Sequence, residues 1–264
     1  MIDNRTIEKA NRVVEILKDR GYEAEVCQTN KNGIDVVGIT MGSGDVRPNI
    51  YPDFDMNIDS IANGLIGMYE RTQKATESEG VKALFEDISK FDSVKGDIIP
   101  YITSGVIPGM ATRKYLDLNV YYKIVRKEYS VTIKQEYIDK WGVTEEQLFE
   151  MAKENVKGKF TIENISDIIP VPDSGMFMKV ISLPGRIWGA SALLFPEIFT
   201  ELDDGKDISI IPSSIHELIA LKADDQVGMG LADMIRSVNE TSLDPSDILS
   251  DHPYIYTNGE IKEV

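Results

Sequence analysis

The sequence predicts an α+β fold with antiparallel or mixed sheets, packed helices and two subdomains. Helical and strand-like segments are interspersed, without the strict strand–helix–strand alternation of a doubly wound sheet. Apolar-alternating segments joined by Asn-Gly sequences near both ends of the chain indicate hairpins, which are antiparallel. The 264 residues, 42% of them hydrophobic, suffice to bury a core in one or two domains.

The N-terminal segment predicts a helix followed by a hairpin. Apolar residues recur at helical spacing over 7–17, and Gly21 follows where a helix-ending glycine is expected. Two β-rich runs, 23–29 and 34–40, flank the turn sequence Asn-Lys-Asn-Gly, whose residues tolerate positive φ. A second helix is predicted over 61–69.

Two glycines interrupt this second helix. Its apolar stripe consists of Ile61, Leu65, Met68 and Tyr69. Gly64 and Gly67 lie between these residues, and each costs about 1 kcal/mol of helix stability relative to alanine. Glycines at such positions often allow close packing.

A stretch rich in proline, glycine and serine, 100–112, is the best candidate for a domain boundary. We therefore expect an N-terminal α+β subdomain over 1–100 and an acidic C-terminal α+β subdomain over 113–264. The charge distribution supports this distinction, because residues 133–264 carry 24 acidic and 11 basic side chains.

The C-terminal part begins with the clearest patterns. Residues 116–124 alternate apolar and polar side chains, and Val131 and Ile133 continue this alternation in a second strand. Thr144 and Gln147 form a capping box at the start of a helix with a buried apolar stripe. The remaining expectations are strands at 176–182, 207–211 and 217–221, helices near 191–203, over 227–238 and from Asp244-Pro245, and a hairpin over 254–264.

The formal net charge of −16 bears on partners and location. Nucleic-acid binding depends on basic side chains that displace counterions, and the sequence has no basic patch. The longest nearly apolar run, 187–196, is about half a membrane span, and the first residues lack the basic and apolar regions of a signal peptide. We expect a cytoplasmic protein that binds neither nucleic acid nor membranes.

A metal site of cysteine and histidine is disfavoured, because the chain has one cysteine and two histidines. Oxygen ligands at alternate positions, as in the first part of a calcium loop, occur at Asp53, Asp55, Asn57 and Asp59. The glycine and the bidentate glutamate of that loop are replaced by Ile58 and Gly64, so these residues fit a helix N-terminus better. We expect no metal, with Asp53, Asp55 and Asp59 as the weak candidates.

No cofactor is expected either. The loop at 42–45 follows a predicted strand, but position 47 is Arg47 where a phosphate-binding fingerprint requires a third glycine. The pairs Gly158-Lys159 and Gly205-Lys206 lack the upstream glycine and the following Ser or Thr of a P-loop.

The segment 212–217 carries the densest group of reactive side chains. Ser213, Ser214, His216 and Glu217 follow an apolar strand directly. A serine nucleophile with His216 as general base and Glu217 as the orienting acid is the hydrolase interpretation. The segment lacks the Gly-x-Ser-x-Gly elbow and the second histidine of the helical zinc-protease motif. The alternative is structural, with the serines forming turns and His216 bonding backbone groups.

Several segments of the C-terminal half together resemble an uncharacterised bacterial family, domain of unknown function 5688. They are the run from Trp141 to Leu148, Gly189-Ala190 before an apolar segment, the 212–217 segment and Leu249-Ser250-Asp251. The resemblance extends over most of the chain and implies a cytoplasmic protein of Gram-positive bacteria. It supplies no catalytic residues.

Together these observations favour an accessory or binding protein for a protein partner or a small ligand. The C-terminal sheet and the 212–217 segment are the expected location of its site. The alternative function is a hydrolase-like enzyme that uses Ser213 or Ser214 with His216 and Glu217. The absence of standard nucleotide, metal and nucleophile motifs supports the first function over the second.

Overall fold

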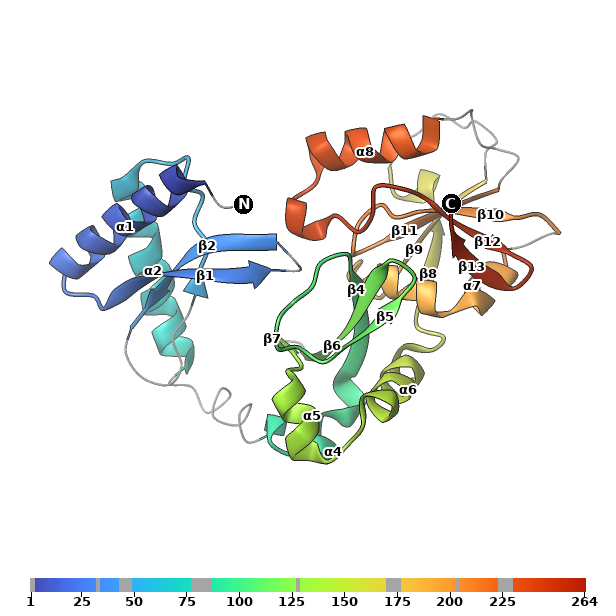
Figure 1. Ribbon diagram of the computed structural model, residues 1–264, viewed down its shortest axis with the longest axis horizontal. Coiled ribbons are helices and arrows are strands. Elements are labelled where there is room, and N and C mark those ends of the chain that lie inside the picture. The colour runs from blue at the N-terminus through green and yellow to red at the C-terminus, as the bar shows by residue number, and fades with distance from the viewer. Residues whose placement is uncertain are drawn as a thin grey trace. The chain divides into compact units, whose positions relative to one another are not determined.

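A computed structural model shows the chain as two compact units, Met1–Ser89 (unit 1) and Lys90–Val264 (unit 2), which are described separately (Figure 1). The residues that it describes are 3–31, 34–42, 49–76, 87–126, 129–169, 177–202, 205–222 and 230–264. All of the strand pairs in this part of the chain are antiparallel, and they form three sheets accompanied by helices. The predicted α+β class is therefore confirmed. The predicted subdomains, 1–100 and 113–264, remain a prediction as independently folding parts.

Unit 1 is a three-stranded sheet with two helices. Its elements are α1 (Asn4–Asp19), β1 (Ala24–Lys31), β2 (Ile34–Met41), β3 (Asn49–Ile50) and α2 (Ile58–Thr76). The predicted hairpin is confirmed by eight paired positions from Ala24↔Met41 to Lys31↔Ile34, although residues 32–33 of its turn lie outside the described residues. The loop at 42–45, considered above for phosphate binding, also falls outside them from residue 43 onward.

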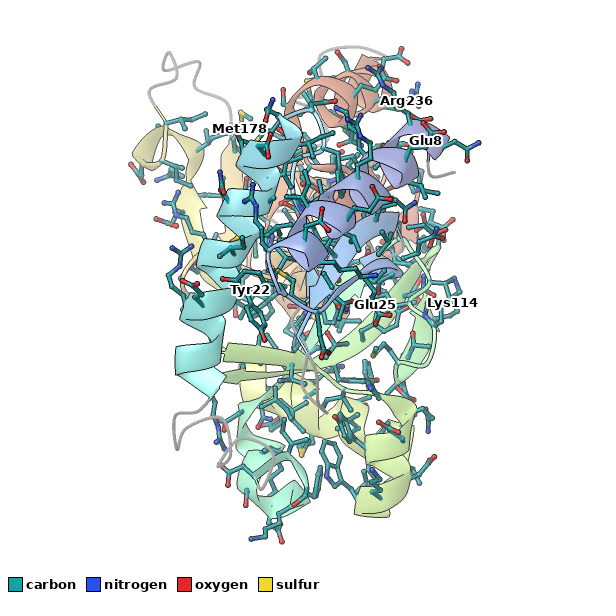
Figure 2. All side chains as sticks on the ribbon, turned by 90° about the vertical axis from the view of Figure 1, so that its left-hand side faces the viewer. Glu8, Tyr22, Glu25, Lys114, Met178 and Arg236 are labelled. Carbon is teal, nitrogen blue, oxygen red and sulfur yellow. The ribbon has the colours of Figure 1, made fainter. Side chains whose placement is uncertain are left out.

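The core of unit 1 lies between the helices and one face of this sheet. Side chains of α1, such as Val13 and Leu17, pack with Ile39 and Met41 of β2 and with Leu65 of α2. Period-3.6 stripes on the helices and period-2 alternation on the strands bring these apolar side chains to one face each. Tyr22, labelled in Figure 2, adds a polar tie because its hydroxyl donates to the Glu70 carboxylate on α2 at 2.9 Å.

The first sheet of unit 2 is built around β6. It contains β4 (Ile98–Thr103), β5 (Thr112–Tyr115), β6 (Leu118–Arg126) and β7 (Tyr129–Thr132). The predicted boundary stretch 100–112 thus contains most of β4 and the first residue of β5. Pro100 is accommodated because β4 is an edge strand, where a missing N–H does not interrupt the sheet.

Short helices accompany this sheet. They are α4 (Phe91–Val94), the 3₁₀ helix η1 (Lys95–Asp97), α5 (Gln135–Trp141) and α6 (Glu145–Val156). The predicted capping box is confirmed, since Thr144 and Gln147 bond each other's backbone amides at the start of α6. Leu148 and Ala152 form the buried face of α6, as its sequence pattern predicts.

The second sheet of unit 2 has six strands in the order β13-β12-β10-β11-β9-β8. These strands are β8 (Thr161–Asn164), β9 (Met178–Ser182), β10 (Ile208–Ile211), β11 (Leu218–Lys222), β12 (Tyr254–Thr257) and β13 (Glu260–Glu263). The predicted C-terminal hairpin is confirmed as β12 and β13, with Asn258 and Gly259 at positive φ in its turn. The helix α8 (Leu231–Ser242) buries Ile235 against this sheet.

Two predicted helices of unit 2 differ from the structure. The helix expected near 191–203 is a 3₁₀ helix, η3 (Gly189–Leu194), followed by the short α7 (Pro196–Thr200). The break falls at Phe195, whose ψ of 74° is outside the helical region, because proline disfavours a helical conformation in the residue before it. The helix expected from Asp244-Pro245 is a single 3₁₀ turn, η6 (Pro245–Asp247); one further 3₁₀ helix is η2 (Ile165–Asp167).

Gly189 of unit 2 is tightly enclosed by backbone atoms. A Cβ added there would lie 2.5 Å from the carbonyl oxygen of His216, 2.5 Å from Cα of Ser182 and 2.7 Å from the carbonyl oxygen of Ile181. All three are backbone atoms, so a side chain cannot be accommodated by a rotamer change.

We therefore predict that Gly189→Ala lowers the free energy of unfolding of the whole chain by about 3 kcal/mol or more, as measured by urea titration. Gly96→Ala is the matched control, because its added Cβ meets no atom within 4 Å, and we expect a change below about 1 kcal/mol. Equal effects of the two substitutions would contradict this account of Gly189.

Candidate functional site

The 212–217 segment forms the turn between β10 and β11. The Ser213 hydroxyl donates to the Glu217 carboxylate at 3.1 Å, and the Ser214 hydroxyl accepts from the His216 amide at 3.0 Å. The Ser214 amide donates in turn to the carbonyl of Glu217 at 3.2 Å. The structure therefore brings Ser213 together with Glu217, and it uses Ser214 within the turn.

The imidazole of His216 faces away from this serine chemistry. Its Nδ1 accepts a hydrogen bond from the Trp188 amide at 3.3 Å, so Nε2 carries the proton of the neutral ring. Nε2 lies 3.8 Å from the carboxylate of Asp247. Within the described part of the chain, no hydrogen bond joins the ring to Ser213 or Ser214. This arrangement leaves no lone pair on His216 with which to accept a serine proton.

The segment instead holds the chain around Trp188 in place. Trp188 has φ 49° and ψ 27°, a left-handed conformation that is uncommon for a bulky residue. The amides of Gly189 and Ala190 donate to the carbonyls of His216 and Ile215 at 2.8 and 3.3 Å. These hydrogen bonds hold the local backbone in place. A strained residue persists only where the surrounding structure holds it in this way.

The calcium-like aspartates serve local roles in unit 1. One carboxylate oxygen of Asp53 accepts from the Asp55 amide at 2.8 Å, and Asn57 accepts from the Asp59 amide at 2.9 Å at the start of α2. The Asp59 carboxylate pairs with Arg20 at 3.2 Å. In the described ranges, no three His, Cys, Asp or Glu side chains form a group that could hold a metal ion, so Asp53, Asp55 and Asp59 do not converge.

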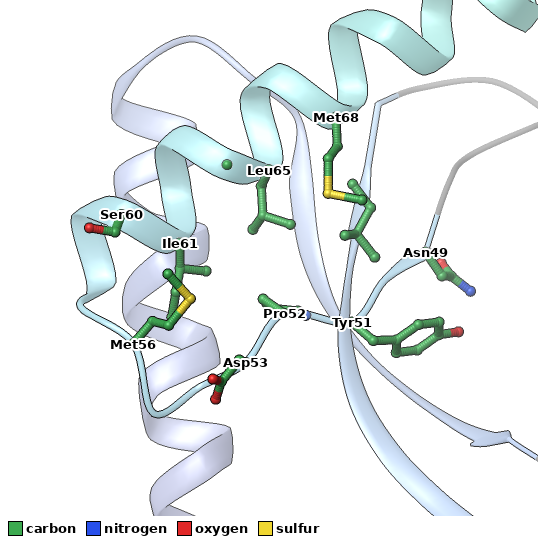
Figure 3. Close-up of a pocket in the computed structure, with 11 residues that line it drawn as sticks. Asn49, Tyr51, Pro52, Asp53, Met56, Ser60, Ile61, Leu65 and Met68 are labelled. Atoms are coloured by element: carbon green, nitrogen blue, oxygen red, sulfur yellow. The ribbon is translucent and has the colours of Figure 1, made fainter. Parts of the chain in front are cut away.

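Asp53 instead lines a groove of about 590 Å³ in unit 1, which we call the α2 groove (Figure 3). One side consists of residues 49–53 and Met56. The other side consists of five residues of α2: Ser60, Ile61, Gly64, Leu65 and Met68. The volume lies within the range of small-ligand pockets, and the side chains that line it are mainly apolar.

Three large side chains at the α2 groove remain exposed to solvent. Met56 is 52% exposed, Met68 46% and Tyr51 43%. Monomeric proteins seldom leave apolar groups exposed together around one concavity, and those that do often use them for binding. Met68 belongs to the apolar stripe of its helix, but its side chain is not buried. The spacing of apolar residues identifies one face of a helix, but it does not show whether another element covers that face.

The wall of the α2 groove is anchored to the sheet. A Cβ added to Gly38 on β2 would lie 2.7 Å from the ring of Tyr51, so this glycine allows the ring to lie against the strand. β3 joins the wall to β2 through the pair Ile39↔Ile50. The ammonium group of Lys9 on α1 donates to the carbonyl of Phe54 at 2.5 Å. These contacts tie the wall of the groove to β2 and α1.

Lys123 on β6 is a partly buried charged side chain that the sequence pattern does not reveal. Burial lowers the pKa of its ammonium group to about 8. Its Nζ donates to the Thr132 hydroxyl at 3.1 Å and lies 4.4 Å from the ring centroid of Tyr101 and 5.7 Å from that of Trp188. The lysine already occupies the space between these groups, so the cluster is structural in this conformation. Because Lys123 takes a polar position in the alternation of this strand, the pattern predicts an exposed side chain and does not reveal its burial.

His252 forms a second polar cluster, between the β5–β6 turn and the start of β12. Its Nε2 lies 3.1 Å from the Asp117 carboxylate and its Nδ1 2.9 Å from the Pro253 carbonyl oxygen. Tyr254 also donates to Asp117 at 2.8 Å. Burial alone would lower the pKa of His252, but its hydrogen bonds to Pro253 and Asp117, with the charge of Asp117, outweigh burial and raise it.

The sequence of the chain identifies the family to which it belongs. The profile of a family of unknown function, DUF5688, matches residues 6–258. The chain belongs to this family. The DUF5688 resemblance found in the sequence is thereby confirmed, and the family brings no established activity. No curated protein and no solved structure matches the chain. Of the DUF5688 helices that the structure describes, none is long and apolar enough to span a membrane.

A second prediction concerns His216. We expect His216→Ala to lower the free energy of unfolding by about 1–2 kcal/mol in urea titration, because the half-buried Trp188 amide loses its acceptor. Ser213→Ala is the control and should change it by less than about 1 kcal/mol. Wild-type stability of His216→Ala would show that the ring does not hold this part of the backbone.

A third prediction concerns pH. Both partners of His252 are acceptors, so the doubly protonated ring is favoured in the folded state and its pKa is raised. Its stabilising contribution, about 0.5–1 kcal/mol for a partly exposed pair, is fully present below its unfolded pKa of about 6.5. It is lost as the pH rises through the folded-state pKa.

Urea titrations of the wild type and of His252→Gln between pH 5.5 and 8.5 measure this contribution. The stability difference between the two proteins should shrink as pH increases. A difference that stays constant across this range would contradict the assignment.

Proposed function

We propose that this DUF5688 protein is a binding protein, and that the α2 groove takes up an apolar group of a protein partner. The observation that carries the proposal is the exposure of Met56, Met68 and Tyr51 around one concavity. The proposal keeps the function class expected from the sequence and moves its site from the C-terminal sheet to unit 1.

The chemistry of the groove supports an apolar occupant. Methionine side chains are flexible and polarisable, so they adapt to ligands of different shapes. A methionine that passes from about half exposed to buried contributes about 1 kcal/mol to binding. Met56 and Met68, with Tyr51, thus offer a few kcal/mol before any polar contact is made.

The hydrolase alternative has less support. The lone pair of His216 Nδ1 accepts from Trp188, and the hydroxyl groups of Ser213 and Ser214 bond to Glu217 and to the backbone of the turn. An acyl-transfer mechanism needs a serine within reach of a free base.

We place the binding function in the cytoplasm, as the single cysteine suggests.

A fourth prediction tests the groove with Nile red, an uncharged dye whose fluorescence increases in apolar surroundings. The wild-type chain should bind it saturably, and Met56→Ser and Met68→Ser should each weaken binding about fivefold, equivalent to about 1 kcal/mol.

Met234→Ser is the matched control, because Met234 on α8 of unit 2 is 49% exposed and lies outside the groove. It should bind the dye like the wild type. Unchanged binding by both groove variants, or an equal loss in Met234→Ser, would overturn the proposed function.

A further inference from the structure

The residues of α2 that line the groove follow one face of the helix. Ser60, Gly64 and Met68 are four residues apart, and Ile61 and Leu65 lie beside them. At a rise of about 1.5 Å per residue, this face is about 12 Å long. It therefore presents a continuous strip along two turns of the helix, which Figure 3 shows along one side of the groove.

Gly64 has no packing role within its own unit. A Cβ added there meets no atom within 4 Å in the described part of the chain, so no close neighbour requires glycine. Glycine nevertheless lowers helix stability relative to alanine. Gly67, on the same helix, differs: it does not line the groove, and its added Cβ would touch only the end of the Arg71 side chain at 3.7 Å.

A small residue at Gly64, with Ser60 one turn earlier, leaves the backbone of α2 accessible from the groove. Small side chains at a contact point let a second helix approach at the short end of the usual interaxial distance. An extended segment would find little to pair with, because β3, the strand that borders the groove, is only two residues long. The geometry therefore favours a helical occupant.

The charge of the groove indicates the charge of the polar side chain that its occupant presents. Asp53 is the only charged side chain that lines it, and no ion pair neutralises this carboxylate among the described residues. Two cations of unit 1 are engaged elsewhere, since Lys9 bonds the Phe54 carbonyl and Arg20 pairs with Asp59. A Lys or Arg of the occupant can therefore pair with Asp53.

We infer that the occupant of the α2 groove is an amphipathic helix of a partner protein, which packs its apolar face at Gly64 and presents a basic side chain to Asp53. This inference rests on the proposed function, because it specifies the partner of the same groove. Helix-in-groove binding with apolar anchors one turn apart is a common mode of peptide recognition.

The test uses a fluorescent 14-residue peptide of leucine and lysine arranged at helical spacing, with binding followed by anisotropy. A peptide of the same composition in alternating order controls for attraction to the acidic protein, and a leucine–glutamate peptide reverses the charge. The wild-type chain should bind the helical lysine peptide at least tenfold more tightly than either control.

Two variants locate the contact. Gly64→Ala should raise the urea midpoint of unfolding, as alanine favours helix, and weaken peptide binding at least tenfold. Gly67→Ala should raise the midpoint similarly and bind like the wild type. Asp53→Asn should weaken binding about threefold to fivefold, and its loss should diminish at high salt.

The outcomes separate the two claims. Equal binding of the helical and alternating lysine peptides, or unchanged binding by Gly64→Ala, would overturn the helical partner. If Nile red binding still depends on Met56 and Met68 in that case, the groove remains a binding site. Loss of that sensitivity would overturn the proposed function itself.

Discussion

The architecture of unit 2 depends on the absence of a side chain at Gly189. Its backbone lies against β9 and against the turn that contains His216, closer than any side chain permits. This contact fixes Trp188 in a left-handed conformation, and the indole then packs on the cluster of Tyr101 and Tyr121 in the neighbouring sheet. The polar residues of 212–217 are thus parts of a joint between two sheets, which explains why reactive side chains gather there without forming a catalytic arrangement.

Unit 1 uses glycine in two opposite ways. Gly38 makes room for the Tyr51 ring, so the space that its missing side chain leaves is filled from within the chain and the groove wall is held to the sheet. At Gly64 that space stays open. A glycine whose neighbouring space is filled by another side chain is explained by packing within the fold. A helical glycine whose neighbouring space stays open lowers helix stability, and no contact in the described structure compensates for this. That contrast is why α2, rather than the more reactive 212–217 segment, draws attention as a binding surface.

Local patterns predicted much of this fold. The stripe of α1, the first hairpin and the capping box of α6 depend on neighbours in sequence, and each was found where expected. β4 was missed because Pro100 and the glycine-rich stretch after it suggest a loop, and only its edge position in the sheet makes the proline acceptable. Asp53 was a weak candidate for a metal ligand, but its neighbours in space, not in sequence, place it in an apolar groove.

The partly buried ammonium group of Lys123 makes the free energy of unfolding of unit 2 depend on pH. Its folded-state pKa of about 8 lies below the ordinary lysine value, so folding releases a proton between these two pH values and stability increases with pH there. His252 has the opposite effect just above pH 6.5, where folding takes up a proton. As far as these two side chains are concerned, the stability of unit 2 falls with pH where His252 loses its proton and rises with pH above the folded-state pKa of Lys123.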